Sequence, residues 1–373
     1  MPPASARLDG VDAARGIALL GMFAVHLLPA VDADGTPTWS EEIARGRSSA
    51  AFALLAGVAL ALAHGRQVPL SGRRWAGASA GLLVRCLLIG LLGLLLGAGD
   101  SGLAVILAYY AVLFALAAPL LGLGPRALAG IAVGVAVLVP SGSHLVRDDL
   151  APKRGPSPVL GDLGEPGVLL TELTLTGYYP VLAWVAYLAA GMAVGRLALD
   201  RRPVALRLAV GGVALAVGSR LLSDALVSLP AAQEALPPDA TETSHAGTTP
   251  PTTAWWLVIA EPHTATPLDL ATTIGSTLAV LGVMLVVVPL LGPALLPLAY
   301  MGSMTLTLYT VHVLAVAGEL GPSDPEELWV VHAVIALLVA TAWRLTARRG
   351  PLEQLVSWPS HAVAGKVAGA GSR

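Results

Sequence analysis

Residues 78–97 read ASAGLLVRCLLIGLLGLLLG, and this stretch decides the fold class of the chain. It contains a single charge, Arg85. At about 1.5 Å per residue, a helix of this length matches the hydrocarbon core of a bilayer, which is roughly 30 Å thick. Similar apolar runs recur along the chain between Pro, Gly and charged residues. The sequence therefore predicts a polytopic helical membrane protein.

The overall composition excludes a soluble protein. Of 373 residues, 55% are hydrophobic and 12% are charged, and the mean hydropathy is +0.74. Soluble domains carry roughly 25% charged residues, so this chain lacks the polar side chains needed to cover a water-soluble domain. We predict an all-α fold, a single transmembrane domain over residues 1–373 with about ten membrane helices.

The ten predicted helices cover residues 11–28, 48–63, 78–97, 103–121, 127–139, 178–199, 204–222, 268–291, 295–318 and 328–345. The fifth has only 13 apolar residues, fewer than the roughly 17 to 25 that span a bilayer comfortably. If it does not cross, every later helix is inverted. The predicted topology therefore depends on this segment.

The distribution of basic residues between the loops predicts the orientation in the membrane. With ten spans and the N-terminus in the cytoplasm, eleven basic residues fall inside: Arg7, Arg66, Arg73, Arg74, Arg126, Arg201, Arg202, Arg348, Arg349, Lys366 and Arg373. Five fall outside: Arg45, Arg47, Arg147, Lys153 and Arg154. We therefore expect both termini in the cytoplasm of a cell that carries this protein in its plasma membrane, the bacterial inner membrane. Loops 141–177 and 223–267 are then extracytoplasmic, and residues 346–373 form a cytoplasmic tail.

Net charge, cysteine content and sequence motifs limit the classes of function that are possible. The formal charge is −2 and no basic face accumulates, which argues against a nucleic-acid partner. Cys86 is the single cysteine, so no intramolecular disulfide forms. Zinc-ligand spacing and a phosphate loop are both missing from the sequence, which gives no reason to expect a metal site or the commonest ATPases.

Three ionisable residues share one face of the first predicted helix. Asp12, Arg15 and His26 are separated by 3 and 11 residues, and 11 residues at about 100° each return to within roughly 20° of the start. Ionisable groups in hydrocarbon are costly and point to function. A catalytic or relay role is favoured for His26, while Arg15 and Asp12 are candidates for donor binding. The alternatives are an ion pair that anchors the helix end and a histidine bonded across a helix contact.

The ninth predicted helix carries a second polar stripe. Thr305, Tyr309 and His312 lie at spacings of 4 and 3, so they face one way. Tyr309 and His312 are candidate catalytic residues, although such side chains also bond helices together. Arg85, deep in the third helix, either pairs with a carboxylate or holds a phosphate.

Other polar positions carry weaker signals. His263 lies between two prolines before the eighth helix, where it either lines a site entrance or belongs to ordinary turn chemistry. His64, His245, His332 and His361 show no pattern of partners. Gly191 and Gly195 form Gly-x-x-x-Gly, which is typical of helix packing.

The first helix reads LDGVDAARGIALLGM over residues 8–22 and closes on His26. This pattern resembles the transmembrane acyltransferase superfamily, which includes the catalytic domain of heparan-alpha-glucosaminide N-acetyltransferase. The C-terminal third, with GSMTLTLY at 302–309 and RGPLE at 349–353, resembles the YeiB-type membrane proteins. After the first helix the heparan enzyme has an acidic motif, whereas this chain has Ser48-Ser49-Ala50-Ala51-Phe52.

The resemblance implies transfer of an acyl group from cytosolic acetyl-CoA to an acceptor across the membrane, a glycan or another envelope component. It also implies that His26 is the catalytic histidine and that Arg15 contacts the donor or a neighbouring helix. The residues leave a rival open, a transporter or lipid-handling protein in which the His and Arg stripe forms a proton or substrate path. A homo-oligomer is compatible with the sequence.

Overall fold

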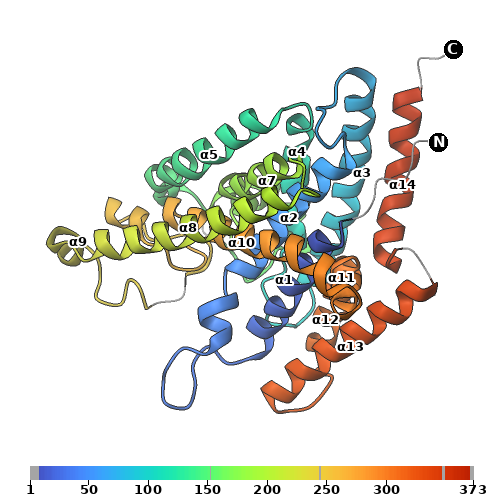
Figure 1. The fold of residues 1–373 in the computed structure, drawn as a ribbon. Coiled ribbons are helices and arrows are strands. Elements are labelled where there is room, and N and C mark those ends of the chain that lie inside the picture. Colours follow the sequence, from blue (N-terminus) through green and yellow to red (C-terminus); the bar gives the residue numbers. More distant parts are fainter. Residues whose placement is uncertain (1–7, 152, 243–244, 347–348, 370–373) are drawn as a thin grey trace.

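The computed structural model describes residues 8–151, 153–242, 245–346 and 349–369. Arg7, Arg348 and Arg373, which enter the count of basic residues, lie outside these ranges. Within the ranges the chain is helical, and its β pairing is confined to a bridge between Val31 and Pro37. The predicted all-α fold is thereby confirmed (Figure 1).

The N-terminal half contains α1 Asp9–Leu27, α2 Arg47–Ala63, α3 Gly72–Gly97, α4 Leu107–Leu120, α5 Pro125–Val146, α6 Pro166–Thr171 and α7 Val181–Gly195. The C-terminal half contains α8 Arg202–Val227, α9 Pro230–Ala235, α10 Pro267–Leu291, α11 Leu296–Gly302, α12 Thr305–Ala317, α13 Pro325–Thr346 and α14 Pro351–Gly369. Short 3-10 or π turns, such as Ser40–Ala44 before α2, connect several of them.

By length and composition, the described residues form seven helices that can cross a membrane, or up to nine if each of two bent pairs is one span. The predicted fifth helix is longer than its apolar run, because α5 extends from Pro125 to Val146 and has 22 residues. It is therefore long enough to span. The predicted fourth helix is shorter than expected, with 14 residues in α4.

The predicted ninth helix, 295–318, is not one continuous helix. It is divided into α11 and α12, which meet at a bend of 77°. The break falls at Gly302 and Ser303, and Gly/Ser pairs are common sites of sharp kinks. The bend directs the first residues of α12, with Thr305, towards α1.

α1 lies inside the bundle, where it packs against α2, α10 and α11. Its contact with α11 depends on glycine: a Cβ on Gly302 would lie 1.7 Å from the Asp12 carbonyl oxygen, and one on Gly16 would lie 2.3 Å from that of Leu298. The Gly-x-x-x-Gly pair of α7 is a packing motif as predicted, because Gly191 and Gly195 lie against the backbone of α2.

The predicted tail, 346–373, contains a helix, α14, that packs along α3 (Figure 1). In the predicted loop 223–267, α9 and a 3-10 turn around Trp256 form a small hydrophobic cluster. These contacts do not show on which side of the membrane the two segments lie. Their location therefore stays a prediction.

Candidate functional site

A cavity of about 240 Å³ lies between α1, α2, α3, α4, α12 and the start of α14. Most of its wall is apolar and comes from α2 and α4, with Phe52, Leu60 and Phe114 among the lining side chains. Its polar lining consists of Arg15, His64, Arg85, Tyr110, Thr305, Tyr309 and Glu353. Residues from both ends of the sequence therefore build one site.

Arg15 joins α1 to the first turn of α12. Its guanidinium donates a 3.0 Å hydrogen bond to the Thr305 hydroxyl, and a second nitrogen lies 3.7 Å from an Asp12 carboxylate oxygen. Asp12 is buried beside the cavity but does not line it. The predicted ion pair therefore exists, and it leaves Arg15 facing the cavity.

Glu353, from α14, caps the N-terminus of α12. One carboxylate oxygen accepts hydrogen bonds from the backbone N–H groups of Leu306 at 2.8 Å and Thr307 at 3.2 Å, and the other accepts one from the Thr307 hydroxyl at 2.6 Å. An anion at this position is stabilised by the free N–H groups and by the helix dipole. The cap holds the first turn of α12, and with it Thr305, at the cavity wall.

Arg85 lines the same cavity from α3. Its guanidinium lies over the Phe114 ring, 5.6 Å from the centroid, and Nε is buried without a hydrogen-bond partner. Among the residues that the structure describes, Arg85 forms no ion pair. Together with Arg15 it makes this part of the cavity suited to an anionic group.

Tyr309 lines the cavity from α12, one turn beyond Thr305. Its hydroxyl is buried and makes no hydrogen bond of normal geometry. The ring centroid lies 6.4 Å from that of His26. Tyr309 therefore lies both at the cavity and beside a second polar group, the histidines.

Three histidines form a hydrogen-bonded row behind Tyr309. Nδ1 of His26 lies 3.1 Å from Nε2 of His312, and Nδ1 of His312 lies 2.9 Å from Nδ1 of His332. Phe23 stacks on the His312 ring at 4.1 Å between centroids. The sequence shows no pattern of partners for His332 because its partner lies on another helix, 20 residues earlier.

The structure thus gathers all the predicted site residues in one region. Arg15, Arg85 and Tyr309 line the cavity, Asp12 pairs with Arg15, and His26 bonds to His312. The sequence reasoning missed His64, Tyr110 and His332, and gave no site role to Glu353. Of these four residues, only Glu353 could have been found from the sequence, because it is the last residue of the RGPLE motif at 349–353.

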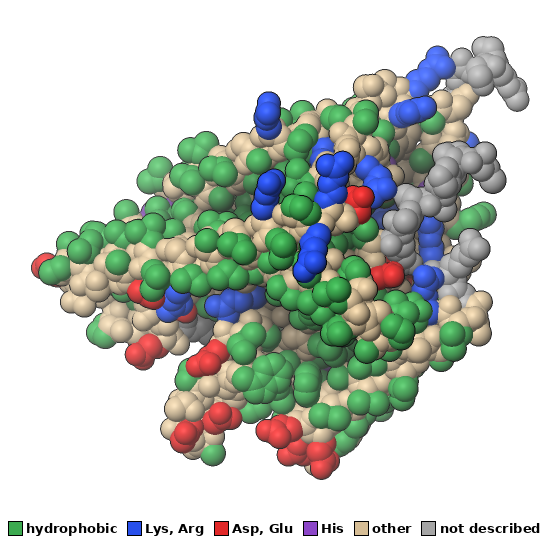
Figure 2. Space-filling model, in the orientation of Figure 1, with side chains coloured by type: hydrophobic (Ala, Val, Ile, Leu, Met, Phe, Trp, Pro, Cys, Tyr) green, Lys and Arg blue, Asp and Glu red, His purple; other side chains and the backbone are tan. Residues whose placement is uncertain are grey.

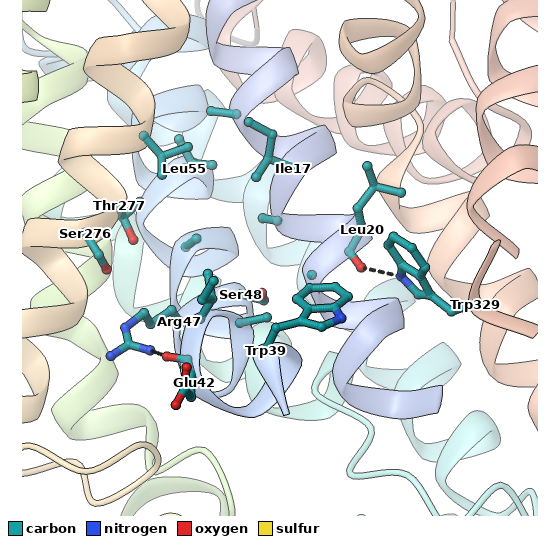
Figure 3. Close-up of a pocket in the computed structure, with 17 residues that line it drawn as sticks. Ile17, Leu20, Trp39, Glu42, Arg47, Ser48, Leu55, Ser276, Thr277 and Trp329 are labelled. Atoms are coloured by element: carbon teal, nitrogen blue, oxygen red, sulfur yellow. Dashed lines mark hydrogen bonds between the residues drawn. The ribbon is translucent and has the colours of Figure 1, made fainter. Parts of the chain in front are cut away.

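A larger hollow, of about 590 Å³, lies on another side of α1 (Figure 3). Ile17 and Leu20 of α1, Trp39 and Trp329 line it, and the Trp329 indole N–H donates to the Leu20 carbonyl. Ile17 and His26 are nine residues apart, which is about half a turn around the helix. This hollow is therefore on the opposite face of α1 from the histidines and is not part of the site.

His263 also lies away from the cavity. It has a φ of 60° and its ring packs at 4.8 Å from Tyr178 and 5.8 Å from Tyr179, between centroids. Burial lowers the pKa of His263 to about 3. The interpretation as part of a structured turn fits these contacts, and none of its ring contacts joins it to the cavity.

Comparison with known proteins gives one result that bears on the site. Residues 7–219 match the family profile described as "Heparan-alpha-glucosaminide N-acetyltransferase, catalytic". A search of curated proteins finds no match. The matched region contains Asp12, Arg15, His26 and Arg85, whereas Tyr309, His312 and Glu353 lie beyond it. The YeiB-type resemblance of the C-terminal third stays a prediction.

Proposed function

The chain belongs to the family of the heparan-alpha-glucosaminide N-acetyltransferase catalytic domain, and from this membership we propose that it is a transmembrane acetyltransferase that takes the acetyl group from cytosolic acetyl-CoA. The acceptor is a hydroxyl or amine of a glycan or another envelope component on the far side of the membrane. The observation that carries the proposal is the cavity between Arg15, Arg85 and Tyr309, with His26 directly behind it.

The size of the cavity indicates how the donor binds. Pockets for drug-sized ligands measure roughly 300 to 1,000 Å³, so about 240 Å³ holds the acetyl group and the thiol-bearing arm but not the whole donor. The methylene and methyl groups of the arm fit the apolar walls formed by α2 and α4. Arg15 and Arg85 supply positive charge for a phosphate or for the polar groups of the arm.

The direction of entry follows from the position of Arg15 on α1. Arg15 and His26 are 11 residues apart, about 16 Å along the helix axis. A donor that passes Arg15 therefore brings its thioester towards Tyr309 and His26. The acceptor reaches the same thioester from the opposite end of α1, so neither substrate has to cross the whole membrane.

His26 acts as the general base. A neutral imidazole takes the proton of the acceptor hydroxyl or amine while the acceptor oxygen or nitrogen attacks the thioester carbonyl. The carbon–sulfur bond breaks, and His26 returns the proton to the departing thiolate. An alternative with the same residue is direct attack by the imidazole, with an acetyl-histidine intermediate.

Tyr309 stabilises the charge that develops during the attack. Its hydroxyl lies in the cavity wall without a hydrogen bond of normal geometry, so it is free to donate to the carbonyl oxygen as that oxygen becomes negative. A hydroxyl that is held ready to donate a hydrogen bond in a low-dielectric site is effective in this role, because little reorganisation is needed during the reaction.

The orientation required by this mechanism agrees with the distribution of charge. Lys and Arg side chains lie mainly over the upper part of the face in Figure 2, whereas most Asp and Glu side chains lie along its lower and left edges. The start of α8 and most of α14 belong to the upper part in the same view, and the start of α13 belongs to the lower (Figure 1). By the positive-inside rule, this distribution supports a cytoplasmic location for the Arg15 end of α1.

The experiment uses the purified full chain in proteoliposomes. We expect release of free CoA from acetyl-CoA in the presence of glucosamine or an envelope glycan extract, together with a mass increase of one acetyl group on the acceptor. Movement of acetyl-CoA or glycan across the bilayer without CoA release supports the rival transporter function instead.

A further inference from the structure

The row of histidines is built from three helices that are far apart in the sequence. His26 belongs to α1, His312 to α12 and His332 to α13. His312 is the middle ring: it is 2% exposed, stacks on Phe23 and uses both of its nitrogens for the other two histidines. Its orientation is therefore fixed from both sides.

A hydrogen bond between two imidazole nitrogens needs one N–H and one lone pair, and a neutral ring has one of each. Because His312 bonds through both nitrogens, its tautomer sets the direction of both hydrogen bonds. In one arrangement Nδ1–H of His26 donates to Nε2 of His312, whose Nδ1–H donates to Nδ1 of His332. In the other arrangement both donations run in reverse.

The proposed role of His26 requires the first of the two arrangements, because only there does Nε2 of His26 keep its lone pair. In this arrangement Nδ1 of His332 accepts from His312, so Nε2 of His332 carries a hydrogen. A hydrogen on Nε2 suits a nearby backbone acceptor, the Leu320 carbonyl in the turn between α12 and α13, which therefore favours the first arrangement.

We propose that His332 is a positioning residue of the transfer reaction: through His312 it fixes the tautomer of His26, so that Nε2 of His26 presents a lone pair to the reacting groups. This inference rests on the proposed role of His26 as the base. It is the same logic by which a third group orients the base in hydrolytic triads, with two neutral imidazoles in place of a carboxylate.

The three histidines also share the positive charge that arises when His26 takes the acceptor proton. When Nε2 of His26 takes the acceptor proton, Nδ1–H of His26 shifts towards His312 and Nδ1–H of His312 shifts towards His332. The positive charge then spreads to the ring beside the Leu320 carbonyl. The shifts reverse when Nε2 of His26 delivers its proton to the thiolate, so the net reaction moves one proton from acceptor to sulfur.

Two substitutions separate positioning from simple packing. His332→Leu fills the space but gives His312 no acceptor, whereas the amide of His332→Asn can accept from His312 and donate to Leu320. His361→Leu is the matched control, because His361 is exposed on α14 and bonds only the Ser357 carbonyl within the described residues. Thermal unfolding in detergent checks that all three variants fold.

The first readout is the tautomer of His26, measured by 15N NMR of histidine-labelled protein in lipid, with the signal assigned through His26→Gln. We expect Nδ1–H and an unprotonated Nε2 in the wild type, in His332→Asn and in His361→Leu, and loss of this single tautomer in His332→Leu. A wild-type His26 protonated at Nε2, or an unchanged tautomer in His332→Leu, overturns the inference.

The second readout is turnover. His332→Leu should lower kcat by roughly 10²-fold, within the range that a correctly placed base supplies, with KM for acetyl-CoA within about twofold, and His332→Asn should recover most of the loss. Equal kcat in His332→Leu and the wild type overturns the inference. A wild type with the expected tautomer but without any acetyl transfer supports the positioning by His332 and overturns the proposed function instead.

Discussion

The guanidinium of Arg15 donates a 3.0 Å hydrogen bond to the hydroxyl of Thr305, a residue 290 positions later in the chain. This bond connects the N-terminal half of α1 to the first turn of α12, just after the 77° bend. It brings the two polar stripes of the sequence to one cavity: Arg15 and Thr305 lie at one part of the wall, and Tyr309, with His26 and His312 behind it, lies at another.

Arg15→Ala is expected to weaken donor binding. A hydrogen bond to a charged group contributes about 1.5 to 3 kcal/mol, so the Kd for acetyl-CoA should rise roughly 10- to 150-fold. Calorimetry in detergent measures the change. Arg126→Ala, at an exposed position at the start of α5, is the control and should leave the Kd unchanged. Equal affinity in Arg15→Ala and the wild type would restrict Arg15 to its contacts with Asp12 and Thr305.

Tyr309→Phe is expected to slow turnover without weakening the fold. Loss of one hydrogen bond to the developing negative charge should lower kcat by roughly 10²- to 10³-fold, while the KM for acetyl-CoA stays close to normal. Because the hydroxyl makes no hydrogen bond of normal geometry, its removal should not lower the unfolding temperature.

The matched control for this change is Tyr179→Phe. Tyr179 is also buried, but its hydroxyl donates to the Ala104 carbonyl at 3.1 Å and it does not line the cavity. This variant should lose about 0.5 to 1.5 kcal/mol of stability and keep its kcat. If both variants lose stability and activity together, Tyr309 is a packing residue.

Gly302→Ala is expected to disrupt the contact between α1 and α11. The added Cβ would overlap the Asp12 carbonyl oxygen, and since both partners are backbone, the helices must move apart. Overpacking of this kind costs about 1 to 3 kcal/mol or more. Gly134→Ala, in α5, is the control: nothing lies within 4 Å of the added Cβ, so this helix should be unaffected or gain about 0.5 to 1 kcal/mol. Equal unfolding temperatures for the two variants in detergent would contradict the close packing.

The orientation of the chain is tested with two single cysteines in a Cys86→Ser background. Glu242→Cys lies in the loop before α10 and Arg201→Cys lies directly before α8, and both positions are exposed. α8 separates them by about 39 Å for its 26 residues. An impermeant thiol reagent should label Glu242→Cys in intact cells and Arg201→Cys only in opened cells. The reverse pattern would place the Arg15 end outside, away from acetyl-CoA.

Much of this arrangement could be predicted from the sequence because it depends on local periodicity. The spacing of 11 residues between Arg15 and His26 fixes a shared helix face whatever the neighbours are. The spacings of 4 and 3 among Thr305, Tyr309 and His312 do the same within α12. The ten predicted helices were located from the lengths of the apolar runs, and each has a counterpart in the structure.

The rest depends on contacts between distant helices, which a single sequence does not encode in any local pattern. His26 and His312 are 286 residues apart, and His332 gains its role only through His312. The break at Gly302 and Ser303 was hidden by a continuous apolar run. The helix α14 escaped prediction because it is rich in Ala, Gly and Ser, and its packing on α3 is a contact between distant segments.

The most direct test of acetyl transfer through His26 is CoA release by wild type, His26→Ala and His26→Asn in proteoliposomes supplied with acetyl-CoA and an envelope glycan extract. Asparagine can replace a hydrogen bond but cannot accept the proton. The account predicts that both variants fold, bind acetyl-CoA with near-normal affinity and release no CoA above background. CoA release by His26→Ala at the wild-type rate would contradict it, and if His312→Ala alone is inactive, the base lies on α12.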